Sequence, residues 1–160
     1  MQRRQSGVRV CAKRSRTRTR SLPIQTALDE AVARSRKHHC QTNEDVVVTG
    51  DFNIAPTDID VWDPAVFIGA THTSEPERKV LSDLCAWGLT DIFREQHPEP
   101  KLFSWWDYRD GSFHKGHGMR IDYLLVTKSL AAKTTETAID RNARKGEKPS
   151  DHAPVTMIVS

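Results

Sequence analysis

The chain has 160 residues and a formal net charge of +3. This length predicts one domain, since domains commonly contain about 100–200 residues. No apolar run approaches the roughly 18 residues of a membrane span and no apolar signal segment is visible, so we expect no membrane association. The cysteines, Cys11, Cys40 and Cys85, are too widely spaced for a disulfide framework or a zinc site, which favours the reducing cytoplasm.

Charge is distributed unevenly along the chain. Residues 1–44 carry 11 Lys and Arg against 3 Asp and Glu, whereas residues 45–160 carry 13 against 18. The first 20 residues are rich in Arg, Ser and Thr and show no structural period. We interpret residues 1–22 as a basic disordered leader ahead of a domain over residues 23–160. A nucleic-acid-binding arm and an organelle transit segment are the alternatives for this leader.

Two segments show the period of an amphipathic helix, and a strand is predicted between them. Residues 23–37 form the first helix, and residues 45–49, which are mostly Val, form a strand buried on both faces. Residues 74–88 form the second helix, in which Ser74 and Glu77 make a capping box.

The apolar face of this second helix also predicts where it packs and where it ends. Gly88 is expected to stop the helix. Cys85 is expected to be a small core residue. The apolar face consists of Val80, Leu81, Leu84 and Cys85.

Further strands are predicted toward the C-terminus, separated by segments that contain Gly, Pro, Lys and Asp. Few helices and several strands after Gly50 predict an α/β or α+β fold with a mostly antiparallel sheet and flanking helices. The predicted strands are residues 102–107, 120–127, 133–139 and 154–159.

Polar residues follow the predicted strand at once in the sequence GDFN, residues 50–53. The simple interpretation is a turn, because Gly, Asp and Asn are common turn formers. The functional interpretation is that Asp51 and Asn53, two residues apart on extended backbone, point the same way and together hold a water and an oxyanion.

A second group of polar residues lies near the C-terminus. Asp151 and His152 stand together between two prolines, and Asp122 lies inside an otherwise apolar strand. A buried carboxylate is costly unless it is paired. Its partner is either Arg120 on the same strand or the imidazole of His152, whose charged form a carboxylate would stabilise.

Residues 102–118, LFSWWDYRDGSFHKGHG, interleave aromatic residues with cations. Such a stretch suits nucleic acid, where bases and sugars stack on rings and phosphates take the positive charges. A core strand followed by a polar hairpin loop is the simpler alternative. Trp105 and Trp106 are expected to point to opposite faces.

In this order, GDFNIAPTDIDVWDP, FSWWDYR followed by GMRID, and PSDHAPV resemble the exonuclease III family of DNA-repair nucleases, over roughly residues 45–160. The resemblance implies the C-terminal half of a four-layer αββα sandwich. It also implies hydrolysis of double-stranded DNA 5′ to abasic sites and at 3′ ends, with Mg²⁺ or Mn²⁺, and a nucleoid-associated location if the source is bacterial.

The resemblance also implies roles for individual residues. Asp51 would orient or deprotonate the attacking water, Asn53 and His152 would hold the scissile phosphate, and Asp122 would stand behind His152. The expected metal donors are Asp51, Asn53 and Asp151. The expected substrate-binding residues are Trp105, Met119 and Ile121, which would line the pocket for the flipped-out abasic sugar, with Arg109 and Lys115.

The motifs that precede GDFN in this family, among them the segment with the principal metal-binding glutamate, have no counterpart that we find in this sequence. We therefore expect a truncated member of doubtful activity on its own, which self-associates or needs a complementing N-terminal half. The alternatives are an inactive DNA-binding fragment and a phosphatase of the same superfamily.

Overall fold

The computed structural model describes residues 9–12, 42–99 and 101–160. Its strands are β1 (Arg9–Ala12), β2 (Val46–Asp51), β3 (Leu89–Asp91), β4 (Trp105–Trp106), β5 (Gly118–Met119), β6 (Asp122–Thr127), β7 (Thr134–Ile139) and β8 (Val155–Val159). Its helices are α2 (Glu75–Ala86), α3 (Ile92–Gln96), α4 (Ser112–Lys115) and α5 (Lys128–Ala131), with 3₁₀ turns η1 (Asp58–Asp60), η2 (Pro64–Phe67), η3 (Arg109–Gly111) and η4 (Arg141–Lys145). Within the described residues, no helix is long and apolar enough to cross a membrane.

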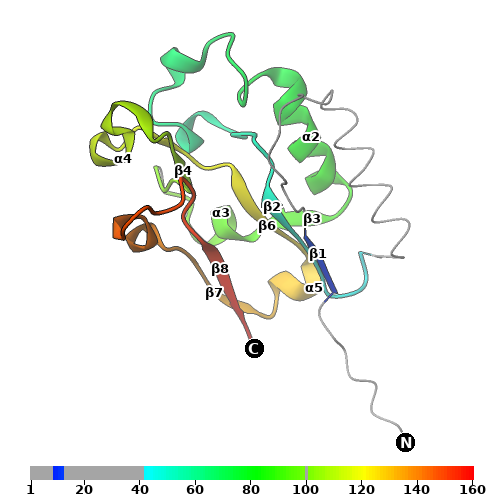
Figure 1. Ribbon diagram of the computed structural model, residues 1–160. Helices are drawn as coiled ribbons and strands as arrows, with labels where there is room; N and C mark the ends of the chain where they lie inside the picture. Colours follow the sequence, from blue (N-terminus) through cyan, green and yellow to red (C-terminus); the bar gives the residue numbers. More distant parts are fainter. Residues whose placement is uncertain (1–8, 13–41, 100) are drawn as a thin grey trace, which may run out of the picture.

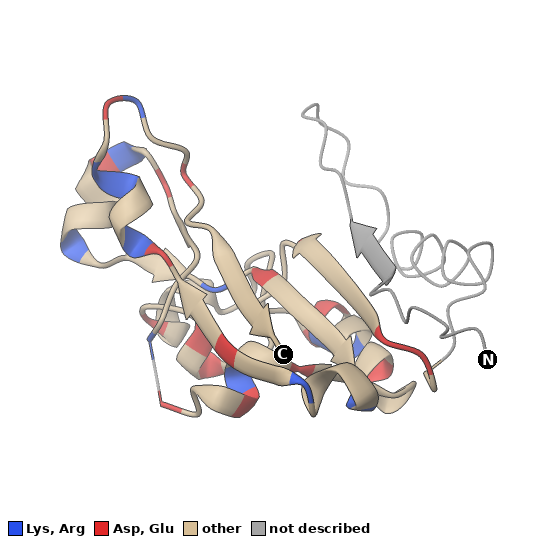
Figure 2. Cartoon of the chain, turned by 90° about the horizontal axis from the view of Figure 1, so that it is seen from below, with Lys and Arg blue, Asp and Glu red and all other residues tan. Residues whose placement is uncertain are grey.

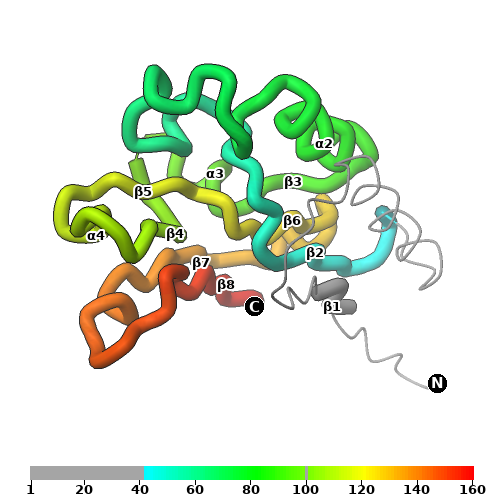
Figure 3. Tube along the Cα trace, turned by 45° about the horizontal axis from the view of Figure 1, so that its top comes forward, coloured from blue at the N-terminus to red at the C-terminus, as the bar shows by residue number. Residues whose placement is uncertain are grey.

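The central sheet has the strand order β1-β2-β6-β3, in which β1 runs parallel to β2 and the other pairs are antiparallel. Because side chains alternate along a strand, β6 serves two cores at once. Tyr123 and Leu125 pack with α2 on one face, while Leu124 and Val126 pack toward β8 on the other. The result is three layers, with α2 above the sheet and the β7–β8 pair below it (Figures 1 and 3). The predicted fold class of α/β with mostly antiparallel sheets and flanking helices is confirmed.

Helix α2 forms as its sequence predicts. Ser74 is the N-cap, the capping box with Glu77 is present, and Gly88 follows the C-cap with a φ of 119°. The one error on this helix concerns Cys85, which is exposed rather than a core residue. The buried face is Val80, Leu81 and Leu84, and Cys85 falls just outside it.

The strand predictions differ from the structure in length rather than in place. Strand β2 is confirmed, and Val47 and Val48 pack on opposite faces of it. The strand predicted over 102–107 is reduced to β4, whose two residues pair with the two residues of β5. Residues 9–12 form β1, so a disordered leader over 1–22 is wrong for these four residues. The predicted helix over 23–37 lies outside the described residues.

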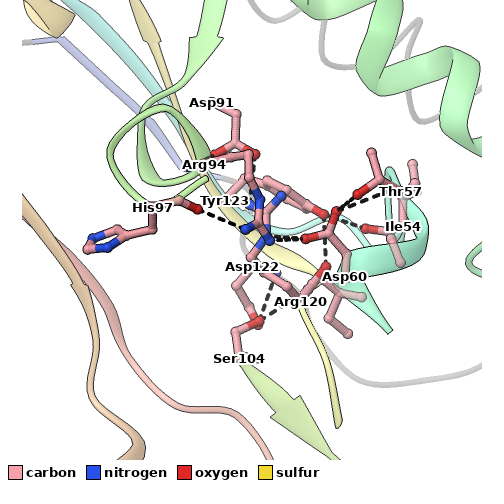
Figure 4. A network of polar contacts seen from close by, with 12 residues as sticks. Ile54, Thr57, Asp60, Asp91, Arg94, His97, Ser104, Arg120, Asp122 and Tyr123 are labelled. Carbon is pink, nitrogen blue, oxygen red and sulfur yellow. Dashed lines mark hydrogen bonds and ion pairs between the residues drawn. The ribbon is translucent and has the colours of Figure 1, made fainter. Parts of the chain in front are cut away.

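A buried ion pair joins three segments that are far apart in sequence (Figure 4). The Asp60 side chain is 0% exposed, and its Oδ1 accepts hydrogen bonds from Arg120 Nε at 2.6 Å and Arg94 Nη2 at 2.5 Å. Its Oδ2 accepts from the Thr57 hydroxyl at 2.6 Å. Burial raises the pKa of Asp60, but Arg120, Thr57 and Arg94 outweigh burial and hold that pKa below its ordinary value. Asp60 is therefore a fully paired carboxylate inside the protein.

Arg120, the partner of Asp60, stands two residues before β6 and makes further contacts with β3 and β6. Its Nη1 donates to Asp91 at 2.7 Å, and its guanidinium lies over the Tyr123 ring at 4.7 Å. The oxygen of the Tyr123 hydroxyl lies 2.8 and 2.7 Å from the carbonyl oxygens of Arg120 and Ile54, and its single proton is shared between them. These contacts fix where β6 begins relative to η1 and α3.

Replacing Asp60 with Ala is expected to destabilise the chain by about 3–5 kcal/mol, because the buried Arg120 guanidinium would lose one of its two carboxylate partners and keep Asp91 alone of the pair. The matched control is Asp58→Ala in the same turn, since Asp58 pairs with Arg78 but its side chain is 68% exposed. An exposed pair of this kind contributes less than about 1 kcal/mol. Urea denaturation measures the free energy of unfolding of both variants. Equal losses in the two would contradict a larger contribution of Asp60 than of Asp58.

Candidate active site

Asp51 and Asn53 are held together by a tight turn at the end of β2. Gly50 has a φ of 140° and Asn53 a φ of 55°, a conformation that glycine and asparagine tolerate best. Asp51 Oδ1 accepts from the Asn53 backbone N–H at 2.8 Å, and Oδ2 accepts from its side-chain amide at 2.9 Å. The two side chains are adjacent as predicted, but a turn rather than extended backbone brings them together.

Asp122 and His152 form the second pair of the site. The β2–β6 register places Asp51 directly opposite Asp122. His152 Nδ1 lies 2.9 Å from Asp122 Oδ2, with the two side chains 30% and 17% exposed. Arg120, the alternative partner of Asp122, bonds Asp60 and Asp91 instead. The interpretation of Asp122 as the partner of the imidazole is therefore confirmed.

The loop that carries Asp151 and His152 is bound to the segment around β4. Trp106 N–H donates to the Asp151 carbonyl at 3.0 Å, and Trp105 and His152 form a β-bridge. The Trp105 indole N–H donates to Asp151 Oδ2 at 3.1 Å. Backbone pairing thus brings the loop and its two polar side chains to the start of β6.

The electrostatics of the site favour a protonated imidazole. Partial burial lowers the pKa of His152, but the hydrogen bond and charge of Asp122, with the charges of Asp51 and Asp151, outweigh burial and raise that pKa above its ordinary value. The imidazole lies near three carboxylates, which come from β2, β6 and the C-terminal loop. In its protonated form it can donate a hydrogen bond to a bound oxyanion and stabilise the negative charge that develops there.

The predicted metal donors have the right chemistry, since carboxylate and amide oxygens suit Mg²⁺ and Mn²⁺. Their number falls short, because among residues 42–99 and 101–160 no three Asp, Glu, His or Cys side chains are arranged to hold a metal ion. Asp51 and Asp151 supply oxygens near His152, and their oxygens also accept from Asn53 and Trp105. The described residues therefore provide part of a donor set for a hard cation.

The residues predicted to bind substrate fall into two groups. Trp105, Met119 and Ile121 pack in one cluster, in which Met119 and Ile121 are only 3% and 2% exposed. Arg109 and Lys115 are exposed beyond β4, and Arg109 is paired with Asp107 at 2.7 Å. The first group therefore packs against the site, and the second is exposed at the surface, where a large ligand has access to it.

Two contacts of the site were not predicted from the sequence. His72 Nδ1 lies 2.7 Å from the Asn53 carbonyl, and the buried Ser104 hydroxyl bonds the backbone next to Asp122. A hollow of about 340 Å³ also borders the Asp122–His152 pair, between β2 and the residues that lead into β8. No local sequence pattern predicts these two hydrogen bonds, because each joins residues at least 18 positions apart.

Comparison with known proteins adds independent findings. The model of the "Endonuclease/Exonuclease/phosphatase family" matches residues 1–152. Exodeoxyribonuclease III of Haemophilus influenzae is 36% identical over 129 residues, which cover 74% of this chain and 47% of that protein. The DNA repair nuclease APEX1 of Danio rerio is 30% identical over 116 residues, which cover 72% of this chain and 36% of that protein.

Solved structures give the same result. A 3′ phosphatase from Neisseria, bound to product DNA hairpin, is 38% identical with a TM-score of 0.76, and the match covers 84% of this chain and 51% of that one. An AP endonuclease from Archaeoglobus fulgidus is 30% identical with a TM-score of 0.75, and the match covers 86% and 55%. The chain thus spans about half the length of the relatives it matches.

Replacing Asp122 with Asn is expected to lower the pKa of His152, because the amide lacks the charge that stabilises the imidazolium. Since the folded pKa of His152 is raised, the pair stabilises the fold below about pH 6.5 and loses this effect as the pH rises through the folded value. The stability difference between the two proteins therefore shrinks toward high pH.

Proton NMR titration of the histidine ring signals, without divalent cations, measures these pKa values. His97, which lies 2.8 Å from the Thr137 carbonyl, is the internal control and is expected to titrate alike in both proteins. A His152 pKa that is the same in wild type and Asp122→Asn would contradict the assignment.

Proposed function

The chain belongs to the endonuclease/exonuclease/phosphatase family, and from this premise we propose that it is a DNA-repair nuclease that hydrolyses phosphodiesters 5′ to abasic sites and at the 3′ ends of duplex DNA. The observation that carries the proposal is the 2.9 Å contact of His152 with Asp122, opposite Asp51 and its bonded Asn53. The relatives, which by name are an exodeoxyribonuclease, a DNA repair nuclease and an AP endonuclease, support the same chemistry. On this proposal the protein acts where the DNA is, which is the nucleoid if the source is bacterial.

Each residue of the site has a task that its contacts suit. The Asp51 carboxylate, on the rigid end of β2, orients or deprotonates the attacking water. The protonated imidazole of His152 faces the phosphate and stabilises the charge of the pentavalent state. Asp122 keeps the imidazole oriented and protonated through Nδ1. The Asn53 amide has a second N–H for a phosphate oxygen, because only one is needed for its bond to Asp51.

We propose that activity requires Mg²⁺ or Mn²⁺, with Asp51, Asn53 and Asp151 among the donors. When bound, such a cation polarises the phosphoryl oxygen and favours ionisation of a water. Since the described residues supply only part of a donor set, we also propose that the 160-residue chain alone binds the metal weakly and turns over slowly.

Duplex DNA is proposed to lie along the end of the molecule that holds η3, α4 and η4. Lys and Arg gather there (Figure 2), and these turns carry the exposed residues Arg109, Lys115 and Lys145. DNA phosphates bind to positive side chains of this kind, while Trp105, Met119 and Ile121 lie next to the site. Arg109 and Lys115 therefore contribute affinity, and Trp105 with Met119 and Ile121 shapes the sugar pocket.

Removal of a phosphate from a DNA 3′ end is the second candidate activity. It is favoured by the Neisseria neighbour, which is described as a 3′ phosphatase bound to product DNA hairpin. Both reactions break a P–O bond at a DNA 3′ oxygen, so one site serves either. The discriminating comparison is an abasic duplex against the same duplex with a 3′-phosphate.

Incision by the purified chain is expected to be slow, to need Mg²⁺ and to fall by about 100-fold in His152→Ala, because a charge-stabilising donor is lost. Single-turnover assays with excess protein and end-labelled abasic duplex measure the rates. The control is Lys79→Ala on α2, whose ammonium is exposed and paired only with Asp83 among the described residues. Incision that His152→Ala leaves unchanged would contradict the proposal.

The surface at β8 supports a proposal about assembly. Within the described residues β8 pairs with β7 alone, and Ile158 on it is 56% exposed. Strand edges of this kind readily pair with another chain. Since the match covers only 51% of the Neisseria structure, we propose that a polypeptide covers this edge and that the isolated chain self-associates through it.

At high protein concentration the isolated chain is expected to exceed the monomer mass in size exclusion with light scattering. Ile158→Lys is expected to shift it toward monomer, because a charge on an edge strand opposes pairing. Lys at Thr135, which is exposed on β7, is the matched control and should leave the mass unchanged. A monomer in the wild type at all concentrations would sink this proposal.

A further inference from the structure

Ser104 is a fully buried residue with no assigned role, and it lies between the two partners of the carboxylate–imidazole pair. It is 0% exposed. Its Oγ accepts hydrogen bonds from the backbone N–H groups of Ile121 and Asp122, each at 3.1 Å. Figure 4 shows this oxygen beneath the start of β6. The side chain therefore holds the residue that carries the carboxylate.

The backbone of the same residue holds the other partner. The Ser104 carbonyl accepts from Ala153 N–H at 2.7 Å, directly after His152. Its own N–H donates to the Met119 carbonyl at 2.9 Å, at the end of β5. One buried residue thus bonds both the strand of Asp122 and the loop of His152.

The hydroxyl lies where regular pairing is interrupted. Residues 120 and 121 fall between β5 and β6, so regular strand pairing is interrupted just before Asp122. Arg120 is fixed there by Asp60, but Ile121 and Asp122 share one side-chain oxygen as acceptor. Removing that oxygen leaves two backbone donors without this partner, and the donor of Ile121 belongs to a residue that is only 2% exposed.

We propose that Ser104 is a positioning residue of the site, whose hydroxyl and carbonyl set the distance between Asp122 and His152. It touches neither substrate nor the reacting atoms. It acts through the orientation of the Asp122 carboxylate toward His152 Nδ1. The catalytic part of this inference rests on the proposed nuclease function, whereas the geometric part does not.

Thr127 provides a matched control at the other end of β6. It is also 0% exposed, and its Oγ1 accepts from Val46 N–H at 3.1 Å and donates to the Glu44 carbonyl at 2.7 Å. Thr127→Val therefore removes a buried hydroxyl that bonds backbone, as Ser104→Ala does, but far along the strand from His152. A merely structural role predicts like effects of the two variants.

The test is the NMR signal of the proton on His152 Nδ1, recorded at one fixed pH without divalent cations. In the wild type and in Thr127→Val we expect a downfield, slowly exchanging proton shared with Asp122. In Ser104→Ala we expect it to exchange at least about tenfold faster, as when a buried hydrogen bond is lost. An unchanged exchange rate in folded Ser104→Ala, or equal loss in Thr127→Val, overturns the proposal.

If Ser104→Ala does not fold, Ser104→Thr keeps the oxygen and is expected to keep the signal, and a folded Ser104→Thr without it overturns the proposal. Where the chain incises abasic duplex, Ser104→Ala is expected to lower kcat about tenfold with KM unchanged, and Thr127→Val to change neither. A protein that shows the NMR difference but no incision supports the role of Ser104 and contradicts the proposed nuclease function instead.

Discussion

The structure depends on the burial of one carboxylate. Asp60 is completely enclosed, and a carboxylate in such a place is tolerated only when its oxygens are fully paired. Arg120, Arg94 and Thr57 meet this requirement from three separate segments. These ion pairs therefore join η1, α3 and the residues that lead into β6. The cost of breaking it is what keeps these segments in one arrangement.

The site follows from that arrangement. Because Arg120 is fixed, β6 must begin at Asp122, and its antiparallel register places Asp122 opposite Asp51. The tight turn after Gly50 then presents Asn53 beside Asp51. The last member, His152, comes from a loop bound to the residues around β4. Three distant segments thus bring one imidazole and three carboxylates together where β2 ends and β6 begins.

The sequence was most informative where the cause of structure is local. Helix α2 follows from a capping box and a helical period within one segment, and GDFN and SDH are short motifs whose meaning lies in their residue types. The exposure of Cys85 was missed because the buried face of α2 is narrower than its apolar stripe. Strand β3 and helix α3 were missed because each is too short to show a period.

What local pattern cannot supply is the choice among distant partners. Arg120 stands two residues from Asp122, yet it bonds Asp60, which is 60 positions away. The turn at Asn53 replaced extended backbone because a positive φ allows Asp51 to accept two hydrogen bonds from it. Ser104 looked like one residue of a strand, whereas its hydroxyl substitutes for pairing at the break before β6. Each of these outcomes is decided by packing in three dimensions.

We propose that a DNA phosphate binds at His152, which Asp122 holds near Asp51. A crystal structure of the chain with a short duplex that contains an abasic-site analogue tests it most directly. We expect the phosphate 5′ to the abasic site to lie within hydrogen-bond distance of His152 Nε2, at about 2.7–2.9 Å, and the Asn53 amide to donate to a second phosphate oxygen. A duplex bound only along η3, α4 and η4, with no phosphate near His152, would contradict it.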